Sequence, residues 1–170
     1  GFARQLSIEE LANVIVNEFK FGVGDSGIKP GIIGEIGLAY PVHPREEIVL
    51  RAAIRAQIAT GAALLIHPGR DPRAPKEALA IVEEENGDIS RTIMSHIDRT
   101  LFTLESMIEV AKTGCILEFD LFGQESSYYP IAPIDLPNDG TRIDYIQALI
   151  GKGYLNNLVI SQDIGNKIHL

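Results

Sequence analysis

The stretch Gly31-Ile-Ile-Gly-Glu-Ile-Gly37 is a short apolar run with one carboxylate, Glu35, near its carboxyl end. Runs of this kind are typical of strands that are buried on both faces of a sheet. Three later segments have the same form, and each stops at or near a residue able to bind a metal: Ala63-Leu-Leu-Ile-His67, Thr92-Ile-Met-Ser-His96 and Leu158-Val-Ile-Ser-Gln-Asp163. The repeated pattern predicts that the four polar side chains meet and hold a metal centre.

Helical segments separate these strands. Ser7 and Glu10 have the spacing of a capping box, which predicts a helix from residue 7 to about 21. Pro44 suits the first turn of a second helix, which we expect to run to about Thr60. The remaining expected elements are helices over 75–87, 104–113 and 141–152 and a strand over 115–120. Regular alternation of helix and strand indicates a parallel sheet covered by helices.

Two α/β architectures fit this alternation, the doubly wound open sheet and the eight-stranded barrel. In barrels, residues at the carboxyl ends of several strands converge on one site, whereas an open sheet joins only the strands beside its switch point. Polar residues end five predicted strands here: Glu35, His67, His96, Asp120 and Asp163. The sequence has no Gly-rich phosphate loop between a strand and a helix. We therefore predict a barrel.

The number of strands is too small for a closed barrel. Five strands can be counted, whereas a (β/α)8 TIM barrel has eight and about 250 residues. We expect residues 1–170 to form a single incomplete barrel domain. The segment 121–138, with three prolines and paired tyrosines, interrupts the alternation, and the sequence assigns it no role.

Composition limits the classes of partner. The formal net charge is −8, which argues against nucleic acid and against an anionic membrane surface. No run of about 18 apolar residues and no signal-peptide pattern is present, so we expect no membrane span and a cytoplasmic protein. The single cysteine, Cys115, cannot form an internal disulfide and is expected to be a buried, inert thiol.

Two imidazoles and two carboxylates make a site for zinc or a similar divalent ion. Such an ion lowers the pKa of bound water and supports hydrolysis at neutral pH. Glu35 has two oxygens and could bridge two metals, and Asp163 could bind a metal and accept a proton. Alternatives stay open at this point, because a histidine at a strand end is also a common hydrogen-bonded core residue, and Asp120 can be a ligand or a structural residue.

With these residues in place, the chain resembles the phosphotriesterase-related proteins, a branch of the phosphotriesterase family in the amidohydrolase superfamily. The matching segments are Gly31–Gly37, Ile66-His-Pro-Gly-Arg70, Met94-Ser-His-Ile-Asp-Arg-Thr100, Glu118-Phe-Asp-Leu-Phe-Gly123 and Ile160-Ser-Gln-Asp163. The resemblance implies strands 4 to 8 of the barrel, without the amino-terminal strands and the carboxyl-terminal end, and a binuclear centre of zinc or a similar ion in the full-length parent. It implies that Glu35 is the bridging ligand, that His67 and His96 bind one metal, and that Asp163 binds the other and handles the proton.

The chain also departs from the family pattern. The first-strand His-X-His pair is absent, and Leu121 and Arg99 stand where bacterial phosphotriesterases relay a proton through a histidine and an acid. Phosphotriester turnover is therefore not expected. The related-protein branch is associated with amide hydrolysis, including that of N-acetyltaurine, and Arg70 is the residue we expect to meet its sulfonate.

Three functional hypotheses remain. The first is a metal-dependent hydrolase of a small-molecule amide or ester, active as the full-length parent. The second is a truncated, catalytically inactive barrel fragment or isoform that acts, if at all, through partner binding. The third is a barrel enzyme without a metal, which is disfavoured because every lysine falls in a predicted helix or loop rather than at a strand end. The oligomeric state is left open.

Overall fold

The computed structural model describes residues 6–125, 129 and 132–165, and within them the predicted alternation of helix and strand is confirmed. The helices are α1 (Ile8–Phe21), α2 (Pro44–Thr60), α3 (Ala74–Glu84), α4 (Leu104–Ala111) and α5 (Asp139–Gly151). The strands are β1 (Ile32–Gly37), β2 (Ala63–His67), β3 (Thr92–Met94), β4 (Ile116–Phe119) and β5 (Leu158–Ile160). Short 3-10 turns join several of them, including η4 (Ile97–Arg99) after β3.

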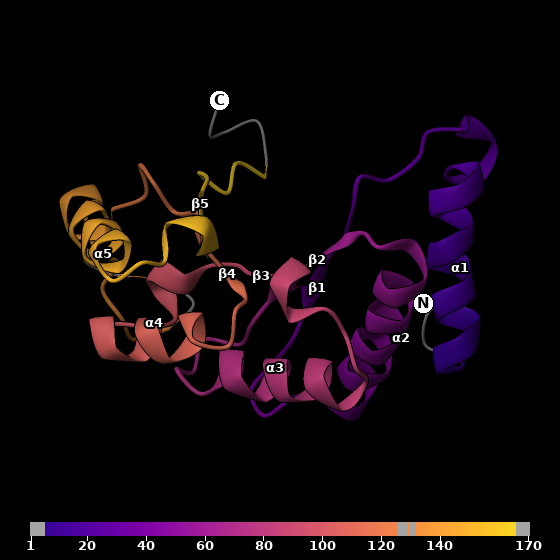
Figure 1. The fold of residues 1–170 in the computed structure, drawn as a ribbon, viewed down its shortest axis with the longest axis horizontal. Helices are drawn as coiled ribbons and strands as arrows, with labels where there is room; N and C mark the ends of the chain where they lie inside the picture. The colour runs from indigo at the N-terminus through magenta and orange to yellow at the C-terminus, as the bar shows by residue number, and fades with distance from the viewer. Residues whose placement is uncertain (1–5, 126–128, 130–131, 166–170) are drawn as a thin grey trace.

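The five strands form one parallel sheet in the order β1-β2-β3-β4-β5. Each strand therefore pairs with its neighbour in the sequence, and the order never reverses. A doubly wound sheet would show a reversal at its switch point, so this order supports the barrel type. Figure 1 shows the helices following one another around an arc, from α1 through α3 to α5, with the strands on its inner side.

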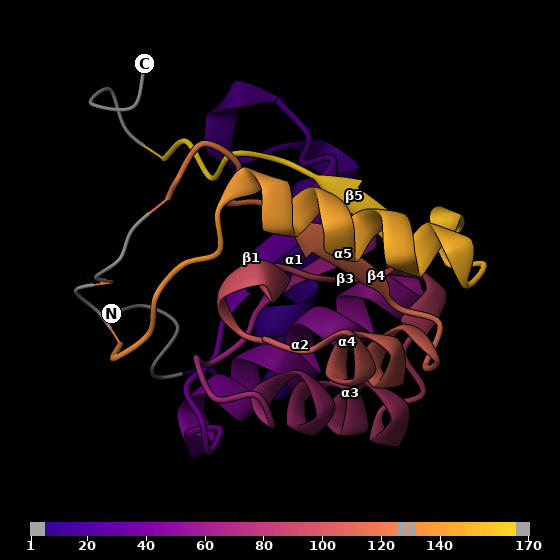
Figure 2. The ribbon, with the colours of Figure 1, turned by 90° about the vertical axis from the view of Figure 1, so that its left-hand side faces the viewer.

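The strands bury one face against the helices. Side chains alternate in burial along β2 and β4, as a pleated strand requires. The buried set forms a single apolar core with the inner faces of α2, α3 and α4: Ile33, Leu64, Ile66, Met94, Leu117 and Phe119 are its strand members. The alternate residues, such as Leu65 and Glu118, point to the inner side of the arc and are only partly buried. Figure 2 shows the same helices from the side of α5.

Local signals fix the helix ends where the sequence predicts them. Ser7 and Glu10 form the expected capping box at α1. His43 accepts a hydrogen bond from the Arg45 backbone N–H at 3.1 Å and caps α2. Gly61 ends α2 with φ 68°, a left-handed conformation that glycine adopts without strain.

Some predicted boundaries shift. Helix α5 begins at Asp139, two residues early, because the Asn138 side chain accepts from the Thr141 N–H and provides the cap. Strand β5 ends at Ile160, so Asp163 lies in the loop after it rather than at the strand end. Part of the 121–138 segment and His169 lie outside the described residues.

Two further expectations concern the thiol and the membrane. Cys115 is a free, fully buried cysteine, and burial raises the pKa of its thiol. A thiol in that state is rarely ionised and therefore unreactive, as predicted. Among the described residues, none of the helices combines the length and the apolar character needed to cross a bilayer.

Candidate metal centre

The geometry of the centre begins at Gly34, one residue before Glu35. The register between β1 and β2 shifts between Ile33 and Ile36, so the chain bulges at this point. Gly34 has φ 143°, and a Cβ placed there would lie 2.6 Å from the Leu65 carbonyl oxygen. Only glycine allows β1 to approach β2 this closely, and the bulge turns the Glu35 side chain toward the ends of β2 and β3.

Glu35, His67 and His96 come from three neighbouring strand ends and meet at one point. The Glu35 Oε1 atom lies 3.0 Å from His67 Nδ1 and 2.9 Å from His96 Nε2, and these two ring nitrogens are 2.9 Å apart. One ligand atom from each residue lies within 4.8 Å of the other two. One oxygen and two imidazole nitrogens are the donor set that zinc and related divalent ions prefer, so the residues present fit such an ion.

Neighbouring side chains hold the three donors in place. Asp120 accepts from the His96 backbone N–H at 3.1 Å, and its second oxygen lies 2.9 Å from His96 Nδ1, which leaves Nε2 directed at the centre. A carboxylate on the far nitrogen of a histidine is the usual way in which a ligand imidazole is oriented. The Ser95 hydroxyl lies 3.2 Å from Glu35 Oε1 and 3.0 Å from the Ile66 carbonyl oxygen. His96 itself has φ 54°, rare for a residue with a side chain.

Charge and burial shift the pKa values at the centre. Burial acts to raise the pKa of Glu35, but the charges of His67 and His96 outweigh it and lower that pKa. Burial and the neighbouring His96 lower the pKa of His67. Burial opposes protonation of His96, yet its hydrogen bond to Asp120 leaves its pKa raised. An ionised Glu35 beside a neutral His67 is the protonation state that a divalent ion needs.

Asp163, in the loop after β5, lines a cleft that also includes Glu35 and His96. The cleft, of about 280 Å³, is lined by residues from all five strands or the loops that follow them: Glu35, Leu65, His96, Glu118, Asp120, Ser161, Asp163, Ile164 and Gly165. Asp163 is exposed, has φ 49°, and is not one of the three residues whose ligand atoms converge. Glu118 is half-buried, and burial together with Asp120 raises its pKa to about 7.

Two arginines flank the centre on the side of β2. Arg99, at the end of η4, is only 2% exposed, and its Nη2 atom lies 2.8 Å from His67 Nε2. Burial and the charge of Arg70 lower the pKa of Arg99. Arg70 is partly buried, and its Nη2 atom lies 3.4 Å from the Tyr129 hydroxyl.

The sequence identified the converging residues but not the ones around them. Glu35, His67 and His96 were predicted to meet, and their ligand atoms do converge. Asp163 was predicted to meet them; it lines the cleft but is not one of the three residues whose ligand atoms converge. Asp120 was left open as ligand or structural residue, and it contacts His96. Ser95, Arg99 and Glu118 were assigned no role. Ser95 could have been found by including every polar residue at the carboxyl end of a strand. No local signal in the sequence marks Arg99 or Glu118.

Similarity to known proteins extends over nearly the whole chain. The model of the phosphotriesterase family matches residues 2–170. A phosphotriesterase-related protein of Nematostella vectensis is 47% identical over 164 residues, which cover 96% of this chain and 47% of that protein. The N-acetyltaurine hydrolase of Mus musculus is 42% identical over 168 residues, which cover 98% of this chain and 48% of that enzyme.

Solved structures agree with this placement. A resiniferatoxin-binding protein from Rhodobacter sphaeroides superposes with a TM-score of 0.89 at 32% identity, covering 96% of this chain and 45% of its own. The phosphotriesterase homology protein of Escherichia coli, solved with phosphate in its active site, gives 0.84 at 31% identity, covering 99% of this chain and 55% of its own. The five-stranded parallel sheet observed here therefore superposes on about half of each of these solved chains.

The chain spans about half the length of the curated relatives it matches. Its fold is therefore part of a TIM barrel, as the strand count predicted, and its strand ends carry three converging ligand-type residues. Matches of the family model to residues 2–170 and of relatives above 40% identity all lead to one conclusion. This chain belongs to the phosphotriesterase family.

Proposed function

We propose that the protein is a metal-dependent hydrolase that cleaves an amide or ester bond in a small molecule, with zinc as the first candidate metal. The observation that carries the proposal is the convergence of Glu35, His67 and His96, whose ligand atoms lie within 4.8 Å of one another. Core histidines normally find separate hydrogen-bond partners, whereas these two direct nitrogens at one carboxylate oxygen. An arrangement of this kind is stable only with a proton or a cation between the three groups.

Each residue has a defined task in this proposal. His67 presents Nδ1 and His96 presents Nε2, while Glu35 supplies the negative charge that offsets a divalent ion. Asp120 holds the His96 ring through Nδ1 and so fixes the direction of the ligand nitrogen. A divalent ion bound here supplies Lewis acidity, because it lowers the pKa of a bound water and polarises a carbonyl group.

Asp163 is proposed as the proton acceptor and as a ligand of a second ion. It lines the cleft that also exposes Glu35 and His96, so a substrate in this cleft lies between Asp163 and the converging donors. The free second oxygen of Glu35 makes it the proposed bridge between two ions. The remaining ligands of a second ion would come from other parts of the barrel.

An N-acyltaurine-like amide is the proposed substrate class. Several relatives that match nearly the whole chain carry the name N-acetyltaurine hydrolase, among them proteins of Mus musculus and Dictyostelium discoideum at 42% and 44% identity. Arg70, which the sequence assigned to the sulfonate, lies near the centre on the β2 side. The activity is proposed for a protein of the full length of these relatives, of which this chain matches about half.

The test compares Glu35→Ala and His67→Ala with the unchanged protein. Metal content is measured by elemental mass spectrometry, and hydrolysis of N-acetyltaurine is followed by NMR. We expect both variants to lose bound metal and at least about 100-fold in kcat/KM, since the Lewis acid is removed. His43→Ala is the matched control, because that histidine caps α2 and touches none of the three donors. Unchanged metal content and activity in both variants would contradict the proposal.

A further inference from the structure

Within the part of the chain that the structure describes, two arginines are almost completely buried, and they have opposite surroundings. Arg142, 0% exposed, forms ion pairs with Asp98 at 2.8 Å and Asp139 at 2.6 Å and donates to the Gln124 carbonyl oxygen at 2.8 Å. Its charge is therefore neutralised inside the protein. A buried cation normally requires such partners, because leaving water costs several kcal/mol.

Arg99, 2% exposed, forms no ion pair among the described residues, although the charges of Asp120 and Glu35 act on it from farther away. Its guanidinium contacts only neutral groups, the Thr100 hydroxyl at 3.4 Å, the Pro68 carbonyl oxygen at 3.5 Å and the His67 ring at 2.8 Å. The first two distances are at the long end for hydrogen bonds. The positive charge of Arg99 is thus buried, and the two carboxylates whose charges act on it, Asp120 and Glu35, lie beyond ion-pair distance.

A second arginine, Arg70, adds positive charge at the same place. Arg70 lies close enough to Arg99 for its charge to act on that guanidinium. It contacts the Tyr129 hydroxyl at 3.4 Å and the face of that ring at 5.7 Å. Its Nε–H is buried and has no hydrogen-bond partner. Two neighbouring cations with an unused buried donor favour an anion between them.

The orientation of His67 adds another donor. His67 directs Nδ1 at Glu35 and His96, and Nε2 at Arg99. When Nδ1 is a metal ligand, the neutral ring carries its proton on Nε2. Nε2 then cannot accept from Arg99, and both groups are donors. An acceptor supplied from outside the chain would satisfy both.

We propose that Arg99 and Arg70 form an anion-binding subsite beside the metal centre, which holds the negatively charged end of the substrate while its scissile bond lies at Glu35, His67 and His96. The inference rests on the hydrolase function proposed above and extends it. Arg99 is its central residue, and Arg70, with the Tyr129 hydroxyl, closes the outer side. The ligand is a small sulfonate or carboxylate joined to an amide by a short linker.

Selectivity between charged and neutral substrates tests the subsite. We compare N-acetyltaurine with N-acetylethanolamine, which has a hydroxyl in place of the sulfonate, and with N-acetyl-β-alanine, its carboxylate counterpart. Arg99→Gln and Arg70→Gln are each expected to lower kcat/KM for the two anions by about 10- to 100-fold and for the neutral amide by less than about threefold, since only charge-assisted hydrogen bonds are lost. A larger loss for one anion identifies whether sulfonate or carboxylate is the natural group.

A matched control distinguishes binding at the subsite from the effect of the protein's overall electrostatic field. Arg73→Gln removes the same charge three residues from Arg70, but the Arg73 side chain is 72% exposed and already paired with Asp71. We expect it to leave the preference for anions unchanged. Equal loss on charged and neutral substrates in both Arg99→Gln and Arg70→Gln, with metal content intact, would overturn the proposal.

A binding measurement keeps the test independent of turnover. Ethanesulfonate and acetate are titrated calorimetrically into the zinc-loaded protein and into each variant. We expect saturable binding of at least one of them to the unchanged protein, and at least about tenfold weaker binding in Arg70→Gln, which removes only the outer guanidinium if Arg99→Gln fails to fold. Absence of anion binding to the unchanged protein would overturn the subsite. Binding without hydrolysis of any substrate would support the subsite and contradict the hydrolase function.

Discussion

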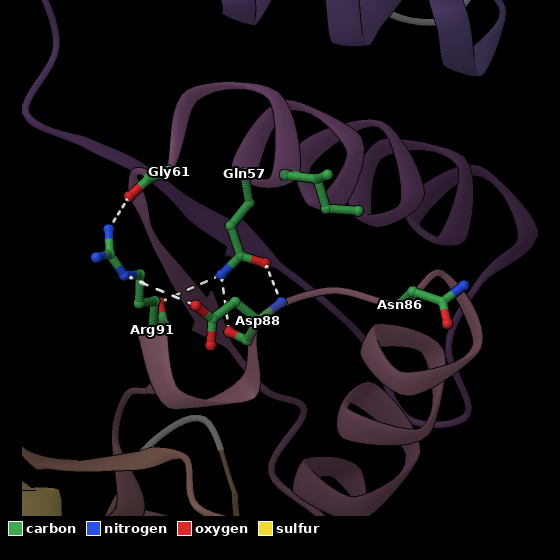
Figure 3. A pocket seen from close by; sticks show the side chains of 6 residues that line it. Gln57, Gly61, Asn86, Asp88 and Arg91 are labelled. Carbon is green, nitrogen blue, oxygen red and sulfur yellow. Dashed lines mark hydrogen bonds and ion pairs between the residues drawn. The ribbon is translucent and has the colours of Figure 1, made fainter.

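The two ends of the parallel sheet use polar side chains for different purposes. At the amino-terminal end, Gln57 of α2 is 1% exposed, and Figure 3 shows it between Gly61, Asp88 and Arg91. Its amide donates to the Asp88 carbonyl oxygen at 3.0 Å and accepts from the Asp88 N–H at 3.0 Å. It also contacts the Thr92 hydroxyl at 3.3 Å. Here donors meet acceptors, and the side chain ties the start of β3 to α2.

At the carboxyl-terminal end, by contrast, several polar side chains converge on one point instead of each having a separate partner. Two imidazoles and a carboxylate oxygen converge, Arg99 is buried without an ion pair among the described residues while the charge of Arg70 acts on it, and His96 and Asp163 have positive φ. Polar groups arranged in this way cost stability and are kept where a ligand completes them. The difference teaches that one sheet carries its structural polar contacts at one end and its site at the other, as barrels do.

Gly34→Ala is expected to have the largest effect, because Gly34 serves both the sheet and the site. A Cβ would meet the Leu65 carbonyl oxygen at 2.6 Å in a backbone conformation that alanine rarely adopts. We expect a loss of about 3 kcal/mol or more in the free energy of unfolding and a displaced Glu35 with reduced metal binding. Urea unfolding and metal analysis measure the two effects.

Gly37→Ala is the matched control for that change. It lies in the same strand, without a positive φ, and a Cβ there meets nothing within 4 Å. Stability should change by less than about 0.5 kcal/mol, as for other tolerated substitutions. Equal behaviour of the two variants would mean that the close approach of β1 to β2 does not position Glu35.

Gln57→Ala should separate the two ends of the sheet. Removing the amide leaves backbone groups of Asp88 and Arg91 without a partner and should cost about 2 kcal/mol of unfolding free energy. Metal content and kcat of the folded protein should stay at their original values. Ile58→Ala, at a 55% exposed neighbour in α2, is the control for helix effects. Loss of metal from folded Gln57→Ala protein would show that the two ends are coupled.

Glu118→Gln should give the smallest effect and one that depends on pH. The pKa of Glu118 is raised from 4.5 to about 7 by burial and by Asp120. The folded state therefore binds more protons than the unfolded state between these values, and the stability of the unchanged protein falls as pH rises through about 4.5 to 7. The glutamine variant lacks this loss, so its advantage should grow from pH 5 to pH 8, reaching about 1 kcal/mol at most for a half-exposed group.

Thermal unfolding of the metal-free protein in a chelator measures that difference. Glu105→Gln, at an exposed glutamate of α4, is the control and should run parallel to the unchanged protein across the pH range. If Glu118→Gln also runs parallel, the carboxyl group is ionised in the folded protein and faces water rather than Asp120.

The sequence alone determined the elements and the convergence. Helix α2 runs from Pro44 to Thr60 as predicted, because a proline, a cap and Gly61 are local signals that act within a few residues. Glu35, His67 and His96 could be predicted to meet because the carboxyl ends of parallel strands lie at the same edge of a sheet, whatever the exact register. The family resemblance, confirmed over residues 2–170, added the assignment of their roles.

Only the tertiary structure decided what surrounds them. Arg99 and Asp98 are adjacent in the sequence, yet Asp98 pairs with Arg142 of α5 while Arg99 turns to His67 of β2 and forms no ion pair in the described part of the chain. Likewise, Asp120 contacts His96 and not the converging oxygen and nitrogens. These outcomes depend on register, bulges and side-chain direction across separate elements. Periodicity and spacing report which face a residue occupies, but they do not specify the partner that it meets there.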